Sequence, residues 1–161
     1  MKAKRITYMS RAFVKEADYR PADLRDRPIS THPNLVTPEG FAAIERAINR
    51  FSAAYRAAVD KHDEAAIAAV QRELRYWSAR RATAKLMESP ADRTHVHFGT
   101  SVLVRREDGR TQTFRIVGED EADPKNGSIS HVSPLARSLL GARIGDTVRA
   151  GAAEAEVADI A

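Results

Sequence analysis

Three carboxylates gather in one short polar stretch, at Asp60, Asp63 and Glu64. Mg²⁺ takes one or two protein carboxylates and keeps its other positions for phosphate oxygens and water. Acids at the end of a long element could therefore deliver a magnesium ligand into a deep cleft of a partner, which makes these three the candidate catalytic residues. The same residues also suit a helix boundary, because Asp63 is a good N-cap, Glu64 complements a helix dipole and Asp60 fits a turn. Of the two interpretations, we favour the helix boundary over the magnesium ligands.

Two histidines, His95 and His97, are spaced so that both imidazoles point to one face of a strand. Such a pair can share a metal ion, but the sequence shows no third ligand beside it. We therefore expect paired surface histidines and assign no metal site. A second group of acids, Asp120, Glu121 and Asp123, does not follow the order of a calcium-binding loop. It predicts a solvated turn or a surface that meets a basic partner.

Basic side chains dominate residues 72–85, where Glu73 is the single acid. A basic flank of this kind could follow an acidic groove of RNA or protein. Arg72, Arg75 and Arg80 are therefore the candidates for facing nucleic acid.

The composition sets the class of protein. The chain has 161 residues, 43% hydrophobic and 30% charged, as expected for one ordinary folded domain or two small ones. Cysteine is absent, which excludes thiol nucleophiles, cysteine zinc sites and disulfides. No nucleophile elbow, P-loop, dinucleotide-binding or zinc-protease motif is present, so we expect no enzyme. No apolar run suits a membrane span or a secretion signal, and we expect a cytoplasmic protein that does not contact membranes.

Positive charge is concentrated at the start of the chain. Residues 1–36 hold eight basic and four acidic side chains, whereas the remainder balances at 18 of each. A basic arm favours polyanionic surroundings such as nucleic acid, or it is simply a solvated tail. Prolines and the lack of any period predict that residues 1–36 form an extended arm.

Residues 37–90 predict a helical hairpin. Thr37, Pro38 and Glu39 form a helix-start signal, and a helix should run over residues 38–59. A second helix should follow the polar break and end at Ser89-Pro90. Apolar residues recur in both segments at alternating steps of three and four, the narrow seam of a coiled coil. The two seams are Phe41, Ile44, Ile48, Phe51, Tyr55 and Ala58, then Ile67, Val70, Leu74, Trp77, Arg81 and Ala84.

Residues 91–161 predict a small α+β domain. The hydrophobic period changes to two from Val96, with a hairpin signal at Asp108-Gly109. A strand over residues 128–132, a helix over 134–140 and closing strands over 144–150 and 155–160 complete the pattern. We expect an antiparallel β-sheet with one short helix, preceded by the helical hairpin.

Several stretches of this second part resemble the C-terminal domain of the bacterial Gre transcript-cleavage factors. They are Phe98–Val102, Phe114–Asp123, Ile129–Gly141 and Ile144–Asp146. The entry into the first helix, Asn34–Gly40, resembles the GreB branch of that family. Together these stretches and the helical part cover about two thirds of the chain.

The resemblance implies an FKBP-like domain that docks on RNA polymerase beside its secondary channel, with the hairpin entering the channel. It implies contact through Ser133 and Pro134, and we expect the acidic loop to dock with them. The polymerase-binding candidates are therefore Ser133, Pro134, Glu119, Asp120, Glu121 and Asp123. The FKBP-like shape does not bring isomerase activity with it, because activity belongs to a site.

The hairpin tip departs from the family pattern. Cleavage-stimulating members carry Gly-Asp-x-Ser-Glu-Asn-Ala there, whereas this chain has Asp60-Lys-His-Asp-Glu-Ala-Ala66, and its hairpin looks shorter. We therefore expect a monomeric accessory factor that occupies the channel, modulates elongation and binds no cofactor alone. One alternative is an active cleavage factor whose tip acids share a Mg²⁺ ion with RNA polymerase. The other is a free-standing nucleic-acid binder, and a contact with nascent RNA also stays open.

Overall fold

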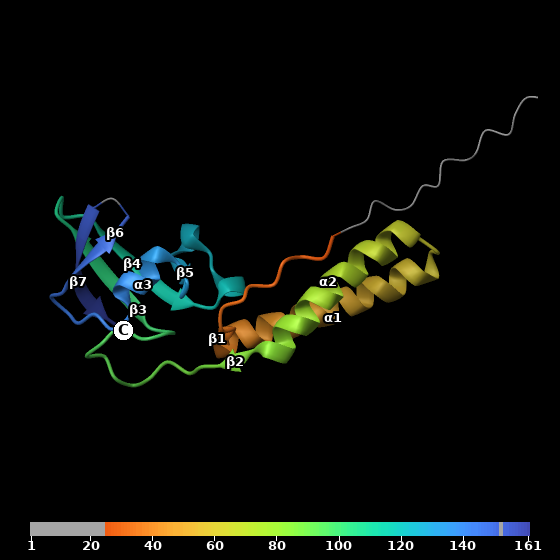
Figure 1. Cartoon of the computed structure of the whole chain (residues 1–161), viewed down its shortest axis with the longest axis horizontal. Helices are drawn as coiled ribbons and strands as arrows, with labels where there is room; N and C mark the ends of the chain where they lie inside the picture. The colour runs from red at the N-terminus through yellow and green to blue at the C-terminus, as the bar shows by residue number, and fades with distance from the viewer. Residues whose placement is uncertain (1–24, 152) are drawn as a thin grey trace, which may run out of the picture.

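A helical hairpin projects from a small β-sheet domain in the computed structural model, which describes residues 25–151 and 153–161 (Figure 1). The hairpin consists of α1 (Pro38–Asp60) and α2 (Glu64–Thr83). The predicted arm falls largely outside the described residues, which begin at Arg25. No helix in the described part of the chain is both long and apolar enough to pass through a membrane.

The first helix begins where the sequence predicts. The side chain of Thr37 accepts a hydrogen bond from the backbone N–H of Gly40, and Pro38 opens the first turn. Ile44 and Ala58 are buried at the seam, and the other seam residues of α1 are half-buried. The seam of α1 is thus confirmed. In α2 the last two predicted seam positions are wrong, because Arg81 is exposed and Ala84 lies beyond the end of the helix.

The second helix ends at Thr83, so the prediction that it continues to Ser89-Pro90 is wrong. The side-chain amide of Asn34 donates to the carbonyl of Arg80 at 2.7 Å and to the Thr83 hydroxyl at 3.1 Å, which satisfies polar groups at the helix end. The chain then extends as β2 (Lys85–Leu86), which pairs in parallel with β1 (Leu35–Val36). A partner far away in the sequence therefore stops the helix.

The β-sheet domain has five strands in the order β5-β4-β3-β7-β6. Three pairs are antiparallel, and the β3–β4 pair forms the predicted hairpin. The β4–β5 pair is parallel, so the sheet is mixed and the all-antiparallel expectation is corrected. Parallel neighbours need a crossover, which the chain makes through two short 3₁₀ turns, η1 (Glu119–Glu121) and η2 (Pro124–Asn126). The strands are β3 (Ser101–Arg106), β4 (Thr111–Val117), β5 (Ser128–Ser130), β6 (Thr147–Ala150) and β7 (Ala153–Ile160).

The core of the domain lies between the sheet and the short helix α3 (Pro134–Leu139). Val102, Val104 and Val157 are fully buried, alternating with more exposed neighbours, as the period of two predicts. Leu139 of α3 is also fully buried against them. The side chain of Ser133 caps α3 as predicted, by accepting from the backbone N–H of Ala136 at 3.2 Å. The α+β class is confirmed, and η1 is left at the edge that faces the hairpin.

Candidate functional site

The hairpin is attached to the β-sheet domain through a buried ion pair. Arg80 of α2 is 2% exposed, and its Nε donates to Oδ2 of Asp120 in η1. The hydroxyl of Tyr76, one turn earlier on α2, donates to the other oxygen of Asp120. One carboxylate therefore binds two side chains on the same face of α2, which fixes the direction of that helix relative to η1.

The next acid in η1 binds α1 in a similar way. Glu121 accepts hydrogen bonds from the backbone N–H of Thr37 at 2.9 Å and from the Thr37 hydroxyl. It also accepts from the N–H of Gly118 at 3.2 Å. A Cβ atom at Gly40 would lie 1.9 Å from Cδ of Glu121, so only glycine admits this carboxylate. Arg80, Tyr76, Asp120, Thr37 and Glu121 are called the junction cluster below.

The junction cluster changes the acid–base behaviour of its tyrosine. Burial of the ring, the hydrogen bond to Asp120 and the negative charge of that carboxylate together raise the pKa of Tyr76 to about 12. The Glu119 side chain is 22% exposed, and one of its oxygens lies 3.9 Å from the Arg80 guanidinium. The cluster therefore holds its buried arginine between two carboxylates.

The structure separates the six predicted docking residues into two groups. Asp120 and Glu121 face the hairpin, and Glu119 lies beside Arg80. Asp123 is exposed and accepts from the side-chain amide of Asn126 at 2.6 Å. Pro134 is exposed at the start of α3, and Ser133 is half-buried because its hydroxyl caps that helix. The sequence analysis did not predict that Glu119, Asp120 and Glu121 contact the hairpin, because their partners are far away along the chain.

The predicted nucleic-acid face of α2 is only partly available. Arg80 as a nucleic-acid contact is wrong, because its guanidinium is buried against Asp120. Arg72 pairs with Glu73 at 3.3 Å, and Arg75, which is exposed, pairs with Asp26 at 2.6 Å. The basic flank is therefore partly neutralised by acids of the chain itself.

The tip of the hairpin has the geometry of a helix boundary. Oδ1 of Asp63 accepts from the backbone N–H of Ala66 at 3.0 Å, which makes Asp63 the N-cap of α2. His62 adopts a left-handed backbone with φ 52°, so the chain reverses sharply there. Asp60 and Glu64 are exposed. The N-cap prediction for Asp63 is confirmed, and Oδ1 of its carboxylate is engaged in that cap.

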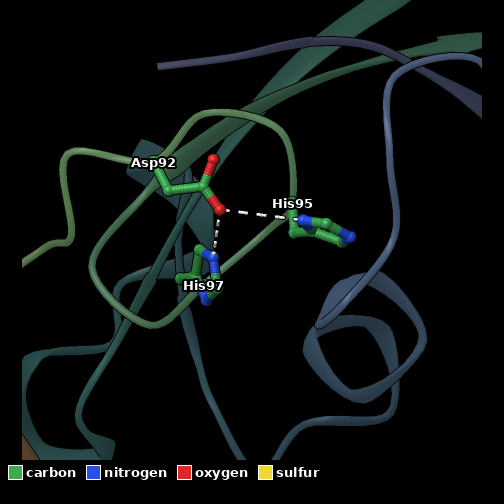
Figure 2. A group of neighbouring side chains, drawn as sticks. All are labelled: Asp92, His95 and His97. Carbon is green, nitrogen blue, oxygen red and sulfur yellow. Dashed lines mark hydrogen bonds and ion pairs between the residues drawn. The ribbon is translucent and has the colours of Figure 1, made fainter.

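His95 and His97 do share a face, as predicted, although the segment that carries them is not a strand. The structure adds a third group, because Oδ2 of Asp92 lies 3.3 Å from Nε2 of His97 and 3.7 Å from Nδ1 of His95 (Figure 2). Hydrogen bonds from the hydroxyl and the N–H of Thr94, and then from His97, hold the pKa of Asp92 well below its ordinary value. Among the described residues, this is the group whose side chains could hold a metal ion.

Comparison with known proteins gives consistent results for the second half of the chain. Residues 91–160 match the family described as transcription elongation factor GreA/GreB, C-terminal domain. GreA of Thermomicrobium roseum is 43% identical over 101 residues, which cover 62% of this chain and 61% of that protein. GreB of Neisseria meningitidis serogroup B is 55% identical over 53 residues, or 33% of this chain and 32% of the relative. The chain thus matches less than two thirds of the length of these relatives.

The comparison with solved structures gives weaker matches. The GreA factor homolog Gfh1 of Thermus thermophilus has 18% sequence identity and a TM-score of 0.40, covering 81% of this chain and 99% of that one. GreA and GreB relatives match this chain with comparable identity, so the similarity does not separate the two branches. Residues 91–160 match the GreA/GreB C-terminal domain, and over this part the chain is similar to transcription elongation factors of the Gre family.

Proposed function

We propose that this chain is a transcription elongation factor that binds RNA polymerase through residues 91–160 and places its hairpin in the secondary channel. The observation that carries the proposal is the GreA/GreB match of the domain to which the hairpin is fixed. The junction cluster supports it mechanically, since a rod can be aimed into a channel only if its base is held. On this proposal the chain is a cytoplasmic, monomeric accessory factor, and any catalysis belongs to RNA polymerase.

Docking is assigned to the start of α3. Pro134 is exposed there, and its ring needs no backbone hydrogen bond at the first helical position. Ser133 fixes the same turn through its cap. Asp123 is the acid of the predicted loop that is exposed on the surface, whereas Asp120 and Glu121 support docking indirectly by holding the hairpin.

Within the channel we propose occupancy and modulation of elongation, without stimulated cleavage. Oδ1 of Asp63 caps α2, so this tip acid has only Oδ2 left and is held at the helix end by its cap. The second candidate function, transcript cleavage, rests on Asp60 and Glu64, which are exposed at the tip and could reach a magnesium ion held by RNA polymerase.

Binding to core RNA polymerase tests the docking assignment. Pro134→Ala should weaken the affinity about fivefold or more, the effect of losing an interface residue worth about 1 kcal/mol. The matched control is Pro28→Ala, because Pro28 is also exposed but lies outside residues 91–160. The measurement is a fluorescence titration with labelled chain. Absence of any association, or equal loss in the two variants, would contradict the assignment.

Backtracked elongation complexes separate the two candidate functions. With occupancy alone, RNA lengths stay the same with and without the chain, while the elongation rate changes. Shortened RNA that disappears with Asp60→Asn or Glu64→Gln would establish the cleavage function instead. Both replacements leave the Asp63 cap in place, so a loss would report on the tip chemistry and not on the fold.

A further inference from the structure

A cluster of two imidazoles and one carboxylate lies outside the site described above. Asp92 belongs to the connection between β2 and β3, and His95 and His97 follow it before β3 begins (Figure 2). One ligand atom from each residue lies within 4.8 Å of the other two. The chain has no cysteine, so a borderline metal ion can be bound here only through nitrogen and oxygen.

The distances within the cluster are close to those around a metal ion. Bonds of about 2.0–2.1 Å at tetrahedral angles place neighbouring ligand atoms about 3.4 Å apart. Oδ2 of Asp92 is already 3.3 Å from His97 Nε2 and 3.7 Å from His95 Nδ1. All three ligand atoms lie within 4.8 Å of one another, so an ion between them would be within reach of each side chain.

The backbone around the ligands is held in place. Both the N–H and the hydroxyl of Thr94 donate to Oδ1 of Asp92, at 2.8 and 2.7 Å, which leaves Oδ2 directed at the histidines. The buried side chain of Val96 lies between the two histidines, and its backbone N–H donates to the carbonyl of Ala142 at 2.8 Å. The hydroxyl of Thr100, also buried, binds the backbone of His97 on both sides. Ligands oriented by such outer hydrogen bonds are typical of metal centres.

We propose that Asp92, His95 and His97 form a binding site for a divalent transition-metal ion, with Zn²⁺ as the fitting case. Two imidazoles and one carboxylate are the ligands that Zn²⁺ accepts, and the exposed side of the cluster leaves a fourth position for water. Because Asp92 lies on the connection that leads from the hairpin and His97 is anchored to the domain core, a bound ion ties this connection to the β-sheet domain (Figure 1).

Arg143 opposes metal binding in the present arrangement. Its Nε donates to Nε2 of His95 at 2.9 Å, and Nδ1 of the same ring lies 2.8 Å from the Thr94 hydroxyl, so in this arrangement the ring proton is on Nδ1. A metal ion on Nδ1 requires the proton to move to Nε2, where it would face the arginine donor. Arg143 is exposed and must turn away for the ion to bind. Its removal should therefore strengthen metal binding.

Calorimetric titration of the full chain with Zn²⁺ tests the site. We expect one ion per chain. Loss of a residue that only hydrogen-bonds to a metal ligand lowers the metal affinity ~10- to 100-fold, so His97→Ala and Asp92→Asn, which remove ligands, should lower the Zn²⁺ affinity by more than that. Asp92→Asn keeps an oxygen that can accept from Thr94, so it removes the charge and preserves the turn. The control is His62→Ala at the exposed hairpin tip, which should bind Zn²⁺ like the wild type.

Two further readouts keep the test independent of folding defects. Zn²⁺ should raise the melting temperature of the wild type and of His62→Ala, but not of Asp92→Asn, because only a ligand bound to the folded state stabilises it. Arg143→Ala should bind Zn²⁺ several-fold more tightly than the wild type. Equal Zn²⁺ affinity in the wild type and Asp92→Asn, or a loss caused by His62→Ala, would overturn the proposal.

Discussion

At the scale of single residues, Asp120 decides how the hairpin meets the β-sheet domain. It neutralises Arg80, which is 2% exposed, and it accepts from Tyr76. Removing one partner of a buried ion pair commonly costs about 3–5 kcal/mol, because the other charge stays buried alone. Removal of Arg80, Tyr76 or Asp120 would therefore leave a polar or charged group of the other two buried without its partner.

Tyr76 gives the junction cluster a measurable dependence on pH. Its pKa is about 12, above the ordinary value of 10.0, so the folded chain holds this proton more tightly than the unfolded chain does. The contribution to stability is complete below about pH 10 and is lost as the pH rises towards 12. Tyr76→Phe should be less stable than the wild type by about 1–2 kcal/mol near neutral pH. The difference in the free energy of unfolding between the two proteins should shrink near pH 11.

Urea unfolding of wild type and Tyr76→Phe at both pH values measures this difference. Tyr55→Phe, which removes the hydroxyl of another half-buried tyrosine of the hairpin, is the control. Its difference from the wild type in the free energy of unfolding should not shrink at high pH. A difference between wild type and Tyr76→Phe that stays constant up to pH 11 would contradict a tyrosine proton held by Asp120.

At the scale of elements, the first turn of α1 serves two purposes. Thr37 caps the helix through Gly40 and also donates to Glu121 of the β-sheet domain. Gly40 leaves room for that carboxylate, since a Cβ would lie 1.9 Å from its Cδ. The start of the helix is therefore also the place where the domain is attached.

Gly40→Ala should destabilise the chain, although the same change inside a helix normally stabilises by about 1 kcal/mol. The added methyl group displaces Glu121 and breaks its hydrogen bonds to Thr37 and Gly118. Chemical denaturation of a double-mutant cycle checks the cause. In a Glu121→Ala background the same substitution should become neutral or stabilising. If Gly40→Ala destabilises equally in both backgrounds, contact with Glu121 is not the reason.

At the scale of the whole molecule, the hairpin acts as a rod whose base is fixed at one edge of the sheet. At ~1.5 Å per residue, the 23 residues of α1 extend about 35 Å, so small rotations at the base move the tip far. The junction cluster contacts both helices through adjacent acids of one 3₁₀ turn. Fixing two helices at once prevents rotation about either contact.

Spin labels can measure this rigidity, because the chain has no cysteine of its own. With Lys61→Cys at the tip and Glu107→Cys in the domain, both exposed, the distance distribution should be narrow. Adding Asp120→Ala and Glu121→Ala should broaden it markedly, whereas adding Asp123→Ala should leave it unchanged. Pulsed electron paramagnetic resonance gives the distribution. Equal widths in all three proteins would mean that the junction cluster does not hold the hairpin.

The elements were largely determined by the sequence alone, because their signals are local. Thr37 and Pro38 start α1, and Ser133 and Pro134 start α3, through contacts three residues apart. The seam and the alternating strands follow from periods of about 3.5 and two. The GreA/GreB resemblance was likewise contained in short stretches of residues. The structure agrees with these elements except at Arg81 and Ala84 of the second seam, and the comparisons support the resemblance.

Only the tertiary structure decided how the elements meet. Arg80 and Asp120 are 40 residues apart, and Thr37 and Glu121 are 84 apart, so no local pattern indicates either contact. For the same reason Arg80 was expected at the surface, and α2 was expected to pass the residue where Asn34 ends it. Asp92 is only three and five residues from the two histidines, but they lie in a turn without helix or strand period, so the periodicity did not indicate this contact. Neighbouring residues determine each helix and strand, whereas ion pairs between residues far apart in the sequence form only when the chain folds.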